Sequence, residues 1–452
     1  MLHGQHSMTG STDSNKNIPI AVTTLGCKVN QCDSAAFIQA LEDSGYSIVA
    51  FSEQAELYII NTCVVTLKTE AQSRQVIRRA LRTNPRAQVL VTGCYAQKSP
   101  DELRSISARV HVAGNAEKKQ IPSYVPEILN GAVLQEVSDI HQEKTFTTPA
   151  CSRFLERTRA FLKIQDGCNS RCSYCIVPSV RGPSRSLPPG EVKRRLHGLV
   201  QSGYREIVFT GIHLGAYGLD LTPPVPIVKL LESLEEDLLP VQVRLRLSSI
   251  EPREFTDDLI AFLSRSRIVC PHLHMPLQSA DPAILKKMNR PYTPEYFRRL
   301  VHRITSCVAG MNIGIDVIAG FPGESDEQFL KTLAFLQNLP AAYLHVFPYS
   351  RRTGTPASRF DGQVPEPVKK QRVSALRQLS LTKKQAFYAP YLNRELSVII
   401  ESRRDRQTGR LKGFSRNYIP VLTDGDDSVF GKHVSVRVTE IQKERVFGII
   451  LP

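Results

Sequence analysis

The chain has 452 residues, which at about 150 residues per domain predicts roughly three domains. Apolar residues make up 41% and charged residues 22%, so the chain can bury hydrophobic cores and is not broadly disordered. A net charge of +15 favours a polyanionic partner and argues against a cationic one. Apolar runs fall short of the roughly 20 residues of a membrane span, and residues 1–17 lack the apolar core of a signal peptide. We therefore expect a cytoplasmic protein, without membrane association, that begins with a disordered tail at 1–17.

The first predicted domain, residues 18–138, alternates β-branched runs with helical stretches. Strands are expected at 20–25, 57–61, 88–92 and 110–113, and helices at 33–43 and 69–83. Strands that alternate with helices predict a doubly wound, parallel α/β sheet. Residues 123–148 have no clear period, and we place a linker near 138–152.

A second alternation occupies residues 152–385. Strands are expected at 160–165, 206–210, 243–248, 272–277, 314–319 and 342–347, with helices that include 189–201, 293–307 and 326–339. Six strand–helix units predict a partial (β/α)6 barrel rather than a full barrel of eight units.

The last part of the chain changes character. The segment 351–384 is strongly basic, which indicates either a solvated helix face or a surface for phosphates. Residues 388–452 then contain five short strands, expected at 396–401, 410–415, 418–422, 433–439 and 446–451. This pattern predicts a small, all-β, OB-like barrel.

Cysteine spacing points to an iron–sulfur site. The chain has ten cysteines, and reduced cytosolic thiols that cluster are candidates for metal binding. Cys168, Cys172 and Cys175 follow an expected strand with C-x3-C-x2-C spacing. Three thiolates on one short loop can hold a [4Fe–4S] cube and leave its fourth iron without a protein ligand. Structural zinc is the alternative, but zinc usually takes four ligands, often as two C-x2-C pairs, and the sequence has only one such pair.

Cys27, Cys63 and Cys94 are far apart in the sequence, yet each follows an expected strand. The carboxyl ends of parallel strands lie at one edge of a sheet, so these thiols should converge there. Gly26 and Gly93 beside them allow the close backbone approach that a bulky group needs. The alternative is that each is an ordinary buried cysteine.

Two family resemblances follow from these motifs. The C-x3-C-x2-C spacing, with Tyr174 before its last cysteine, resembles the radical S-adenosylmethionine superfamily. Both cysteine triplets together with the final barrel resemble the radical methylthiotransferases, over nearly the whole chain from residue 18. That resemblance implies two [4Fe–4S] clusters and S-adenosylmethionine as cofactors. It also implies that residues 18–138 hold the second cluster, which carries the inserted sulfur, and that 388–452 form an RNA-binding TRAM domain.

The family has branches for three substrates, which are threonylcarbamoyladenosine (t6A) in tRNA, isopentenyladenosine in tRNA, and an aspartate of a ribosomal protein. The segments Gly26-Cys-Lys-Val-Asn-Gln31 and Thr210-Gly-Ile-His-Leu-Gly-Ala-Tyr-Gly218 resemble the t6A branch most. Arg171 and Pro183 depart from the family pattern, but neither departure removes a cysteine.

The resemblance also implies positions that contact the cofactor, although it assigns no catalytic residue. These positions lie in the cysteine loop and at the barrel strands, and they are Tyr174, Gly211, Ser248, Gln278 and Asp316. A surface for stacking RNA bases is expected in the last barrel, where cations and aromatics interleave at Lys412, Phe414, Arg416, Asn417 and Tyr418. The alternative is that Phe414 and Tyr418 fill the core of that barrel, as the alternation predicts for one of them.

The expected function is therefore methylthiolation of t6A at position 37 of the tRNA anticodon loop. An electron donor such as flavodoxin or ferredoxin and a sulfur donor are implied as partners. Two alternatives remain: a methylthiotransferase for isopentenyladenosine or for the ribosomal protein, and a zinc-bearing RNA-binding protein without catalysis.

Overall fold

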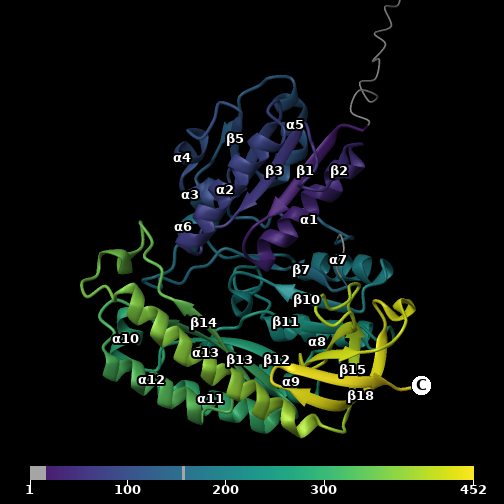
Figure 1. The fold of residues 1–452 in the computed structure, drawn as a ribbon, viewed down its shortest axis with the longest axis vertical. Coiled ribbons are helices and arrows are strands. Elements are labelled where there is room, and N and C mark those ends of the chain that lie inside the picture. Colours follow the sequence, from purple (N-terminus) through teal and green to yellow (C-terminus); the bar gives the residue numbers. More distant parts are fainter. Residues whose placement is uncertain (1–16, 155–157) are drawn as a thin grey trace, which may run out of the picture. The chain divides into compact units, whose positions relative to one another are not determined.

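The computed structural model describes residues 17–154 and 158–452 of the chain (Figure 1). Residues 1–16, which the sequence predicts as a disordered tail, lie outside this described part. The chain divides into two compact units. Unit 1 comprises residues up to 64, 68–140 and 147–149, and unit 2 comprises 65–67, 141–146 and 150–452. Among the described residues, no helix is both long enough and apolar enough to cross a membrane.

Unit 1 is a six-stranded parallel sheet with helices packed against it, in the strand order β2-β1-β3-β4-β5-β6. The strands are β1 (Pro19–Thr24), β2 (Ser47–Val49), β3 (Leu57–Thr62), β4 (Gln88–Gly93), β5 (Val110–Ala113) and β6 (Gln135–Glu136). The helices are α1 (Lys28–Asp43), α2 (Leu67–Thr83), α3 (Cys94–Lys98), α4 (Pro100–Arg104) and α5 (Ile121–Leu129). The expected doubly wound architecture is confirmed.

The core of unit 1 explains why these strands form. Every residue of β3 is buried, and its apolar side chains pack with Phe37 and Leu41 of α1 and with Leu90 of β4. Several elements differ from the expectation. Helix α1 begins at Lys28, directly after Cys27, and β2, α3, α4, α5 and β6 lie where no element was expected. Prolines within α5 interrupt the helical pattern, and β2 has only three residues, too few to show a period.

Unit 2 contains six parallel strands arranged as a partial barrel. They form two sheets, β11-β10-β7 and β12-β13-β14, which isolated bridges join at Leu245↔Val269 and Ser249↔His274. The strands are β7 (Ala160–Lys163), β10 (Glu206–Thr210), β11 (Arg244–Leu247), β12 (His272–Gln278), β13 (Asn312–Ala319) and β14 (Tyr343–Pro348). A short antiparallel pair, β8 (Gln165–Asp166) and β9 (Arg185–Ser186), follows β7.

Helices separate the barrel strands along the chain. They are α6 (Val177–Arg181), α7 (Pro189–Gln201), α8 (Ile227–Leu238), α9 (Asp257–Arg265), α10 (Pro282–Lys287), α11 (Pro294–Cys307), α12 (Asp326–Asn338) and α13 (Glu366–Tyr388). The expected partial barrel with six strand–helix units is confirmed, and most boundaries differ from the expectation by one or two residues.

The C-terminal residues of unit 2 form a closed barrel in the order β15-β16-β17-β19-β18, as the all-β pattern predicts. Its strands are β15 (Glu395–Ile400), β16 (Leu411–Ser415), β17 (Pro420–Thr423), β18 (His433–Gln442) and β19 (Arg445–Ile450). This closed barrel contacts the first residues of the parallel strands. Arg244, which begins β11, donates to the carbonyl of Phe414 at 2.7 Å, and Arg246 donates to that of Arg416 at 3.0 Å.

Three of the five residues in the expected RNA-stacking surface contact the parallel strands of unit 2. Arg416 donates to the carbonyl of Val269 at 3.1 Å. The carbonyl of Asn417 accepts from the side-chain amide of Asn312, the first residue of β13. The ring of Tyr418 lies 4.5 Å from that of His272, which begins β12. These groups join the closed barrel to the parallel strands. An aromatic ring next to a cation can pack against protein as well as against RNA bases.

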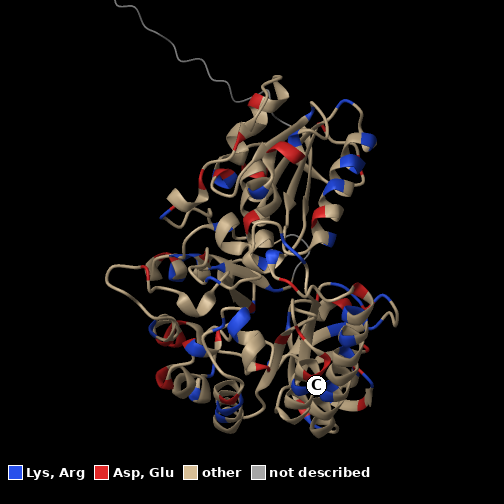
Figure 2. Cartoon of the chain, turned by 90° about the vertical axis from the view of Figure 1, so that its left-hand side faces the viewer, with Lys and Arg blue, Asp and Glu red and all other residues tan. Residues whose placement is uncertain are grey.

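Only some of the cations in the basic segment 351–384 lie on the surface. Lys369, Arg372 and Lys383 are buried, and Arg372 pairs with Glu324 and Asp326, both at 2.7 Å. Lys370 and Arg377 of the same helix, α13, are exposed. In the view of Figure 2, basic and acidic segments are intermixed over the chain. Burial thus removes several cations that the sequence had suggested for phosphate binding.

Candidate functional site

Cys27, Cys63 and Cys94 lie at one edge of the sheet in unit 1. They follow β1, β3 and β4, which are neighbours in the sheet and run parallel. Thr62 is in register with Gly93, so Cys63 and Cys94 leave their strands at the same level. None of the three cysteines is part of a disulfide bond, and Cys63 and Cys94 are buried. The structure therefore brings the three cysteines to one edge, as their positions after strands predict.

Two asparagines connect the loops that carry these cysteines. The side-chain amide of Asn30 donates to the carbonyls of Leu25 and Thr62, each at 2.9 Å. In return, the amide of Asn61 donates to the carbonyl of Asn30 at 2.9 Å. These bonds fix the turn before Cys27 against the turn before Cys63, and no pattern in the sequence predicts them.

The donor set at this edge suits an iron–sulfur cluster. Gly26 has φ +94°, and a Cβ atom on it would lie 2.6 Å from Sγ of Cys63. A larger residue there would occupy the space beside the thiol. Three cysteines at one edge of the sheet, with a glycine backbone beside them, are the ligands and the room that a [4Fe–4S] cube requires.

The second group of cysteines lies on the loop between β8 and α6 of unit 2. Gly167 starts this loop with φ +74°, and a Cβ atom there would lie 1.9 Å from the carbonyl oxygen of Pro183, so only glycine fits. The backbone N–H of Cys168 donates to the carbonyl of Gly182 at 3.0 Å. The backbone N–H of Ser173 donates to the carbonyl of Met288, and the carbonyl of Ser173 accepts from the N–H of Ala357. The loop is therefore held in place by its backbone, and its thiols are left for ligands.

Polar groups surround the thiols of this loop. The backbone N–H of Ser170 donates to Sγ of Cys168 at 3.4 Å, and Arg290 donates to Sγ of Cys172 at 3.3 Å. Burial, together with the neighbouring thiols of Cys172 and Cys168, raises the pKa of Cys175 to about 12. Three thiolates at such a place need a cation to offset their charge, which fits an iron–sulfur cluster.

Nδ1 of His213 lies 3.5 Å from Sγ of Cys168, and its Nε2 forms an ion pair with Glu254 at 2.5 Å. Burial alone would lower the pKa of His213, but these two contacts raise it to about 10. For Cys168, burial alone would raise the pKa, but hydrogen bonds from His213 and Ser170 lower it. The imidazole therefore lies between a thiol and a carboxylate.

The expected cofactor positions line the same end of the barrel. Gly211 follows β10, Ser248 follows β11, and Gln278 ends β12. A Cβ atom on Gly211 would lie 2.8 Å from Oε1 of Gln165, so this glycine leaves room for that amide. Tyr174 is half-buried and packs against a small cluster around Phe321.

Two of these positions have unusual local structure. The hydroxyl of Ser248 is buried and forms no hydrogen bond within the described part of the chain. Gln278 has φ +69°, next to a break in the register of β12 and β13. A left-handed non-glycine residue is strained and is often found at functional sites. A bound ligand would give the Ser248 hydroxyl the partner that it lacks.

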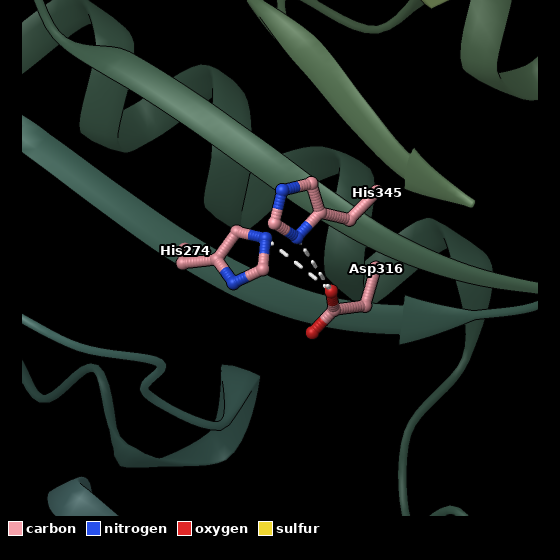
Figure 3. A group of neighbouring side chains, drawn as sticks. All are labelled: His274, Asp316 and His345. Carbon is pink, nitrogen blue, oxygen red and sulfur yellow. Dashed lines mark ion pairs between the residues drawn. The ribbon is translucent and has the colours of Figure 1, made fainter. Parts of the chain in front are cut away.

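Asp316 lies on β13 between two histidines from the neighbouring strands (Figure 3). Its Oδ1 atom is 3.3 Å from Nε2 of His274 and 3.7 Å from Nδ1 of His345. Nδ1 of His274 lies 3.0 Å from the hydroxyl of Ser249. Burial, together with the negative charge of the nearby Glu251, raises the pKa of Asp316 to about 7. Imidazole and carboxylate groups so arranged could hold a divalent cation or bind a polar substrate.

Arg290 shows no functional signal in the sequence, and neither do the side-chain contacts of His213 and Glu254. His213 and Glu254 fall in segments that resemble the family, but neither segment shows that its side chain reaches a thiol. Arg290 is 118 residues from Cys172 along the chain, so no local pattern connects the two.

Comparisons with known proteins agree with this architecture. "Uncharacterized protein family UPF0004" matches residues 19–114, and "Radical SAM superfamily" matches residues 162–336. The chain is 40% identical over 427 residues to a threonylcarbamoyladenosine tRNA methylthiotransferase, MtaB, of Bacillus subtilis, and the match covers 93% of each chain. It is 32% identical to a tRNA-2-methylthio-N(6)-dimethylallyladenosine synthase of Pelotomaculum thermopropionicum, over 95% of this chain and 97% of that one.

Among solved structures, the radical S-adenosylmethionine methyltransferase TsrM of Kitasatospora setae has a similar fold. The TM-score is 0.56 at 16% identity, and the match covers 76% of this chain and 77% of that chain. The length and identity of the match with the Bacillus subtilis protein are sufficient to assign the family. The chain belongs to the threonylcarbamoyladenosine tRNA methylthiotransferases, within the radical S-adenosylmethionine superfamily.

Proposed function

We propose that this protein converts t6A at position 37 of tRNA to its 2-methylthio derivative by radical C–H thiomethylation. The observation that carries the proposal is the pair of cysteine triplets in a chain 40% identical to a relative of this activity. One triplet lies at the carboxyl ends of three parallel strands, and the other lies on the loop that follows β7 and β8. The carboxyl ends of parallel strands are where α/β folds bind ligands. The relative named for dimethylallyladenosine is less similar, at 32% identity, which favours t6A.

Cys168, Cys172 and Cys175 would hold one [4Fe–4S] cluster, and Cys27, Cys63 and Cys94 would hold the other. When bound, the clusters and S-adenosylmethionine supply the electron, the radical, the methyl group and the sulfur of the reaction. The protein contributes the ligands, the orientation of the cofactor and the exclusion of water.

The end of the barrel that carries the cysteine loop would bind S-adenosylmethionine. Tyr174, Gly211, Ser248, Gln278 and Asp316 are the proposed contacts. The unpartnered hydroxyl of Ser248 supports this, because a buried hydroxyl is stabilised when a ligand bonds to it. Gly211 supports the proposed binding too, because a side chain at this position would cover the backbone that the cofactor would approach.

The closed barrel, within residues 388–452, would serve as a TRAM domain that binds the tRNA. We infer that exposed cations bind the phosphates of the tRNA. Several other cations of the chain are buried in ion pairs, where phosphates do not reach them. An adenosine in the anticodon loop can leave its stack without melting a helix. A low-potential electron donor such as flavodoxin or ferredoxin and a sulfur donor complete the proposed set of partners, in the cytoplasm.

Nucleoside mass spectrometry of tRNA tests the proposal. A strain that lacks the native methylthiotransferases for both adenosine derivatives would be complemented with this chain. We expect 2-methylthio-t6A to return while isopentenyladenosine stays unmodified. The Cys168→Ala variant serves as the inactive control. Return of the methylthio group on isopentenyladenosine alone would overturn the assignment of the substrate, and no return of either would overturn the activity.

A further inference from the structure

One short turn after β11 carries two carboxylates, and each of them faces a basic side chain that contacts a different cysteine. Glu251 pairs with Arg290, which donates to Sγ of Cys172 at 3.3 Å. Glu254 pairs with His213, whose Nδ1 lies 3.5 Å from Sγ of Cys168. The turn is therefore connected, through His213 and Arg290, to the thiols of both Cys168 and Cys172.

The turn itself is fixed by its own hydrogen bonds. It forms the 3₁₀ helix η4 (Pro252–Glu254), and the side chains of Glu251 and Glu254 each accept from the backbone of the other in a capping box. A Cβ atom on Gly215 would lie 1.9 Å from Oε2 of Glu254, so this glycine provides the space for the carboxylate. Both carboxylates are thus held before any cofactor binds.

Arg290 is buried, and every part of its guanidinium has a fixed partner. Nη1 bonds to Glu251 at 3.1 Å, Nη2 bonds to the same carboxylate, and Nε donates to the hydroxyl of Tyr292 at 2.9 Å. Nη2 also donates to the carbonyl of Pro276 at 3.2 Å. A side chain with so many bonds keeps one orientation, and that orientation directs an N–H at Cys172.

His213 is fixed in a similar way on the other side. Its backbone N–H donates to Oε1 of Gln165 at 2.7 Å, and Glu254 holds Nε2, which leaves Nδ1 toward Cys168. The backbone N–H of Ser170 approaches the same sulfur. The donors that face Cys168 and Cys172 therefore come from separate segments of the chain and converge on one loop.

We propose that His213 and Arg290 are positioning residues that raise the reduction potential of the cluster held by Cys168, Cys172 and Cys175. Glu251 and Glu254 act through them. The inference rests on the proposed function, because it requires that these cysteines ligate a cluster. Hydrogen bonds to ligand sulfurs withdraw electron density and stabilise the extra negative charge of the reduced state. The cluster then accepts one electron from a low-potential donor more readily.

The test is a redox titration, followed by electron paramagnetic resonance, of the full chain reconstituted without oxygen. A Cys63→Ala background removes the second cluster, so that one cluster gives the signal. We expect His213→Gln and Arg290→Lys each to lower the equilibrium constant for reduction by about tenfold, which for one electron is about 59 mV. Glu254→Gln should shift the potential in the same direction by less, because His213 stays in place without its carboxylate.

Two matched variants serve as controls. His197→Gln removes an imidazole that lies near Asp237, and Arg303→Lys alters a guanidinium that pairs with Asp257; both lie away from the thiols. Neither should move the potential. If the His213 and Arg290 variants keep four irons and the potential of the controls, the inference is wrong. If Arg290→Lys loses its iron, Glu251→Gln, whose side chain touches no thiol, is measured in its place.

The failure of the proposed function has a different signature. If Cys168→Ala in the Cys63→Ala background retains the same iron and the same signal, then the loop holds no cluster, and the premise fails. If the cluster is present and only its potential is insensitive to His213 and Arg290, the premise stands and the inference fails.

Discussion

A Cβ atom on Gly26 would lie 2.6 Å from Sγ of Cys63, although the two residues belong to different strand–loop segments. The turn before the first cysteine and the thiol of the second are therefore in direct contact. Gly26 also has φ +94°, which a residue with a side chain rarely adopts. This contact places two of the three proposed ligands of the second cluster beside each other.

Substitution of Gly26 should consequently remove the second cluster. Gly26→Ala introduces a methyl group where the thiol lies, so the iron content should fall from about eight to about four per chain. Gly131→Ala is the matched control, since Gly131 has φ +91° and nothing within 4 Å of its added Cβ. It should lower the free energy of unfolding by about 1–2 kcal/mol and keep its iron. Equal iron in both variants would contradict the proposed site.

The two cysteine triplets should have separate roles. Cys168→Ala should abolish reductive cleavage of S-adenosylmethionine, because the ligand set of that cluster is broken. Cys63→Ala should still cleave the cofactor to 5′-deoxyadenosine but form no methylthio product. Chromatographic assay of deoxyadenosine and of the modified nucleoside measures both. Loss of cleavage in Cys63→Ala would refute the division of roles, and zinc in place of iron would support the non-catalytic alternative.

Ser248→Ala should separate cofactor binding from folding. The hydroxyl of Ser248 is buried and forms no hydrogen bond with residues 17–154 or 158–452, so its removal should leave the free energy of unfolding unchanged or slightly higher. Affinity for S-adenosylmethionine should fall by roughly fivefold, the equivalent of about 1 kcal/mol for one hydrogen bond. Calorimetric titration measures the affinity. Ser233→Ala, which removes a hydroxyl bonded to the carbonyl of Leu230, should keep it; an equal loss in both would count against a contact at Ser248.

Much of this site could be predicted from the sequence because it depends on strand ends. Cys27, Cys63 and Cys94 follow neighbouring parallel strands, and a parallel sheet brings such positions to one edge whatever their separation. Arg290 could not be predicted, because its contact with Cys172 depends on how a loop 118 residues away packs. The role of Tyr418 could not be decided from the sequence for a different reason: an aromatic beside cations has the same pattern whether it stacks on RNA bases or on His272.

Glu206 should be essential for the attachment of the closed barrel. It is fully buried, and it pairs with Arg244 at 2.6 Å and with Arg246 at 2.8 Å, the two arginines that also bond to the closed barrel. Glu206→Gln leaves buried guanidinium charges without their counterion, so the free energy of unfolding should fall by about 3–5 kcal/mol. Glu232→Gln, in an exposed pair with Lys229, should cost less than about 1 kcal/mol.

The same carboxylate gives a pH dependence with a definite sign. Burial alone would raise the pKa of Glu206, but the guanidiniums of Arg246, Arg244 and Arg159 hold it well below its ordinary value of 4.5. A depressed pKa means that the ionised form stabilises the fold at neutral pH, and this contribution is lost as the pH falls below about 4.5. The difference in unfolding free energy between the native protein and Glu206→Gln should therefore shrink in acid. A difference that grows in acid would contradict the assignment.

We expect the exposed cations of α13, and not the buried ones, to bind tRNA. Lys370 and Arg377 are exposed and seven residues apart, which places them on one face of the helix, two turns apart. Reversal of both charges, by Lys370→Glu with Arg377→Glu, should weaken tRNA binding severalfold and reduce its dependence on salt, because counterion release scales with the number of phosphate contacts. Arg372→Gln should instead destabilise the fold, since Arg372 is buried against Glu324. Filter binding at several salt concentrations, beside denaturant unfolding, distinguishes the two effects. An unchanged salt slope in the double variant would show that this face of α13 does not contact the RNA.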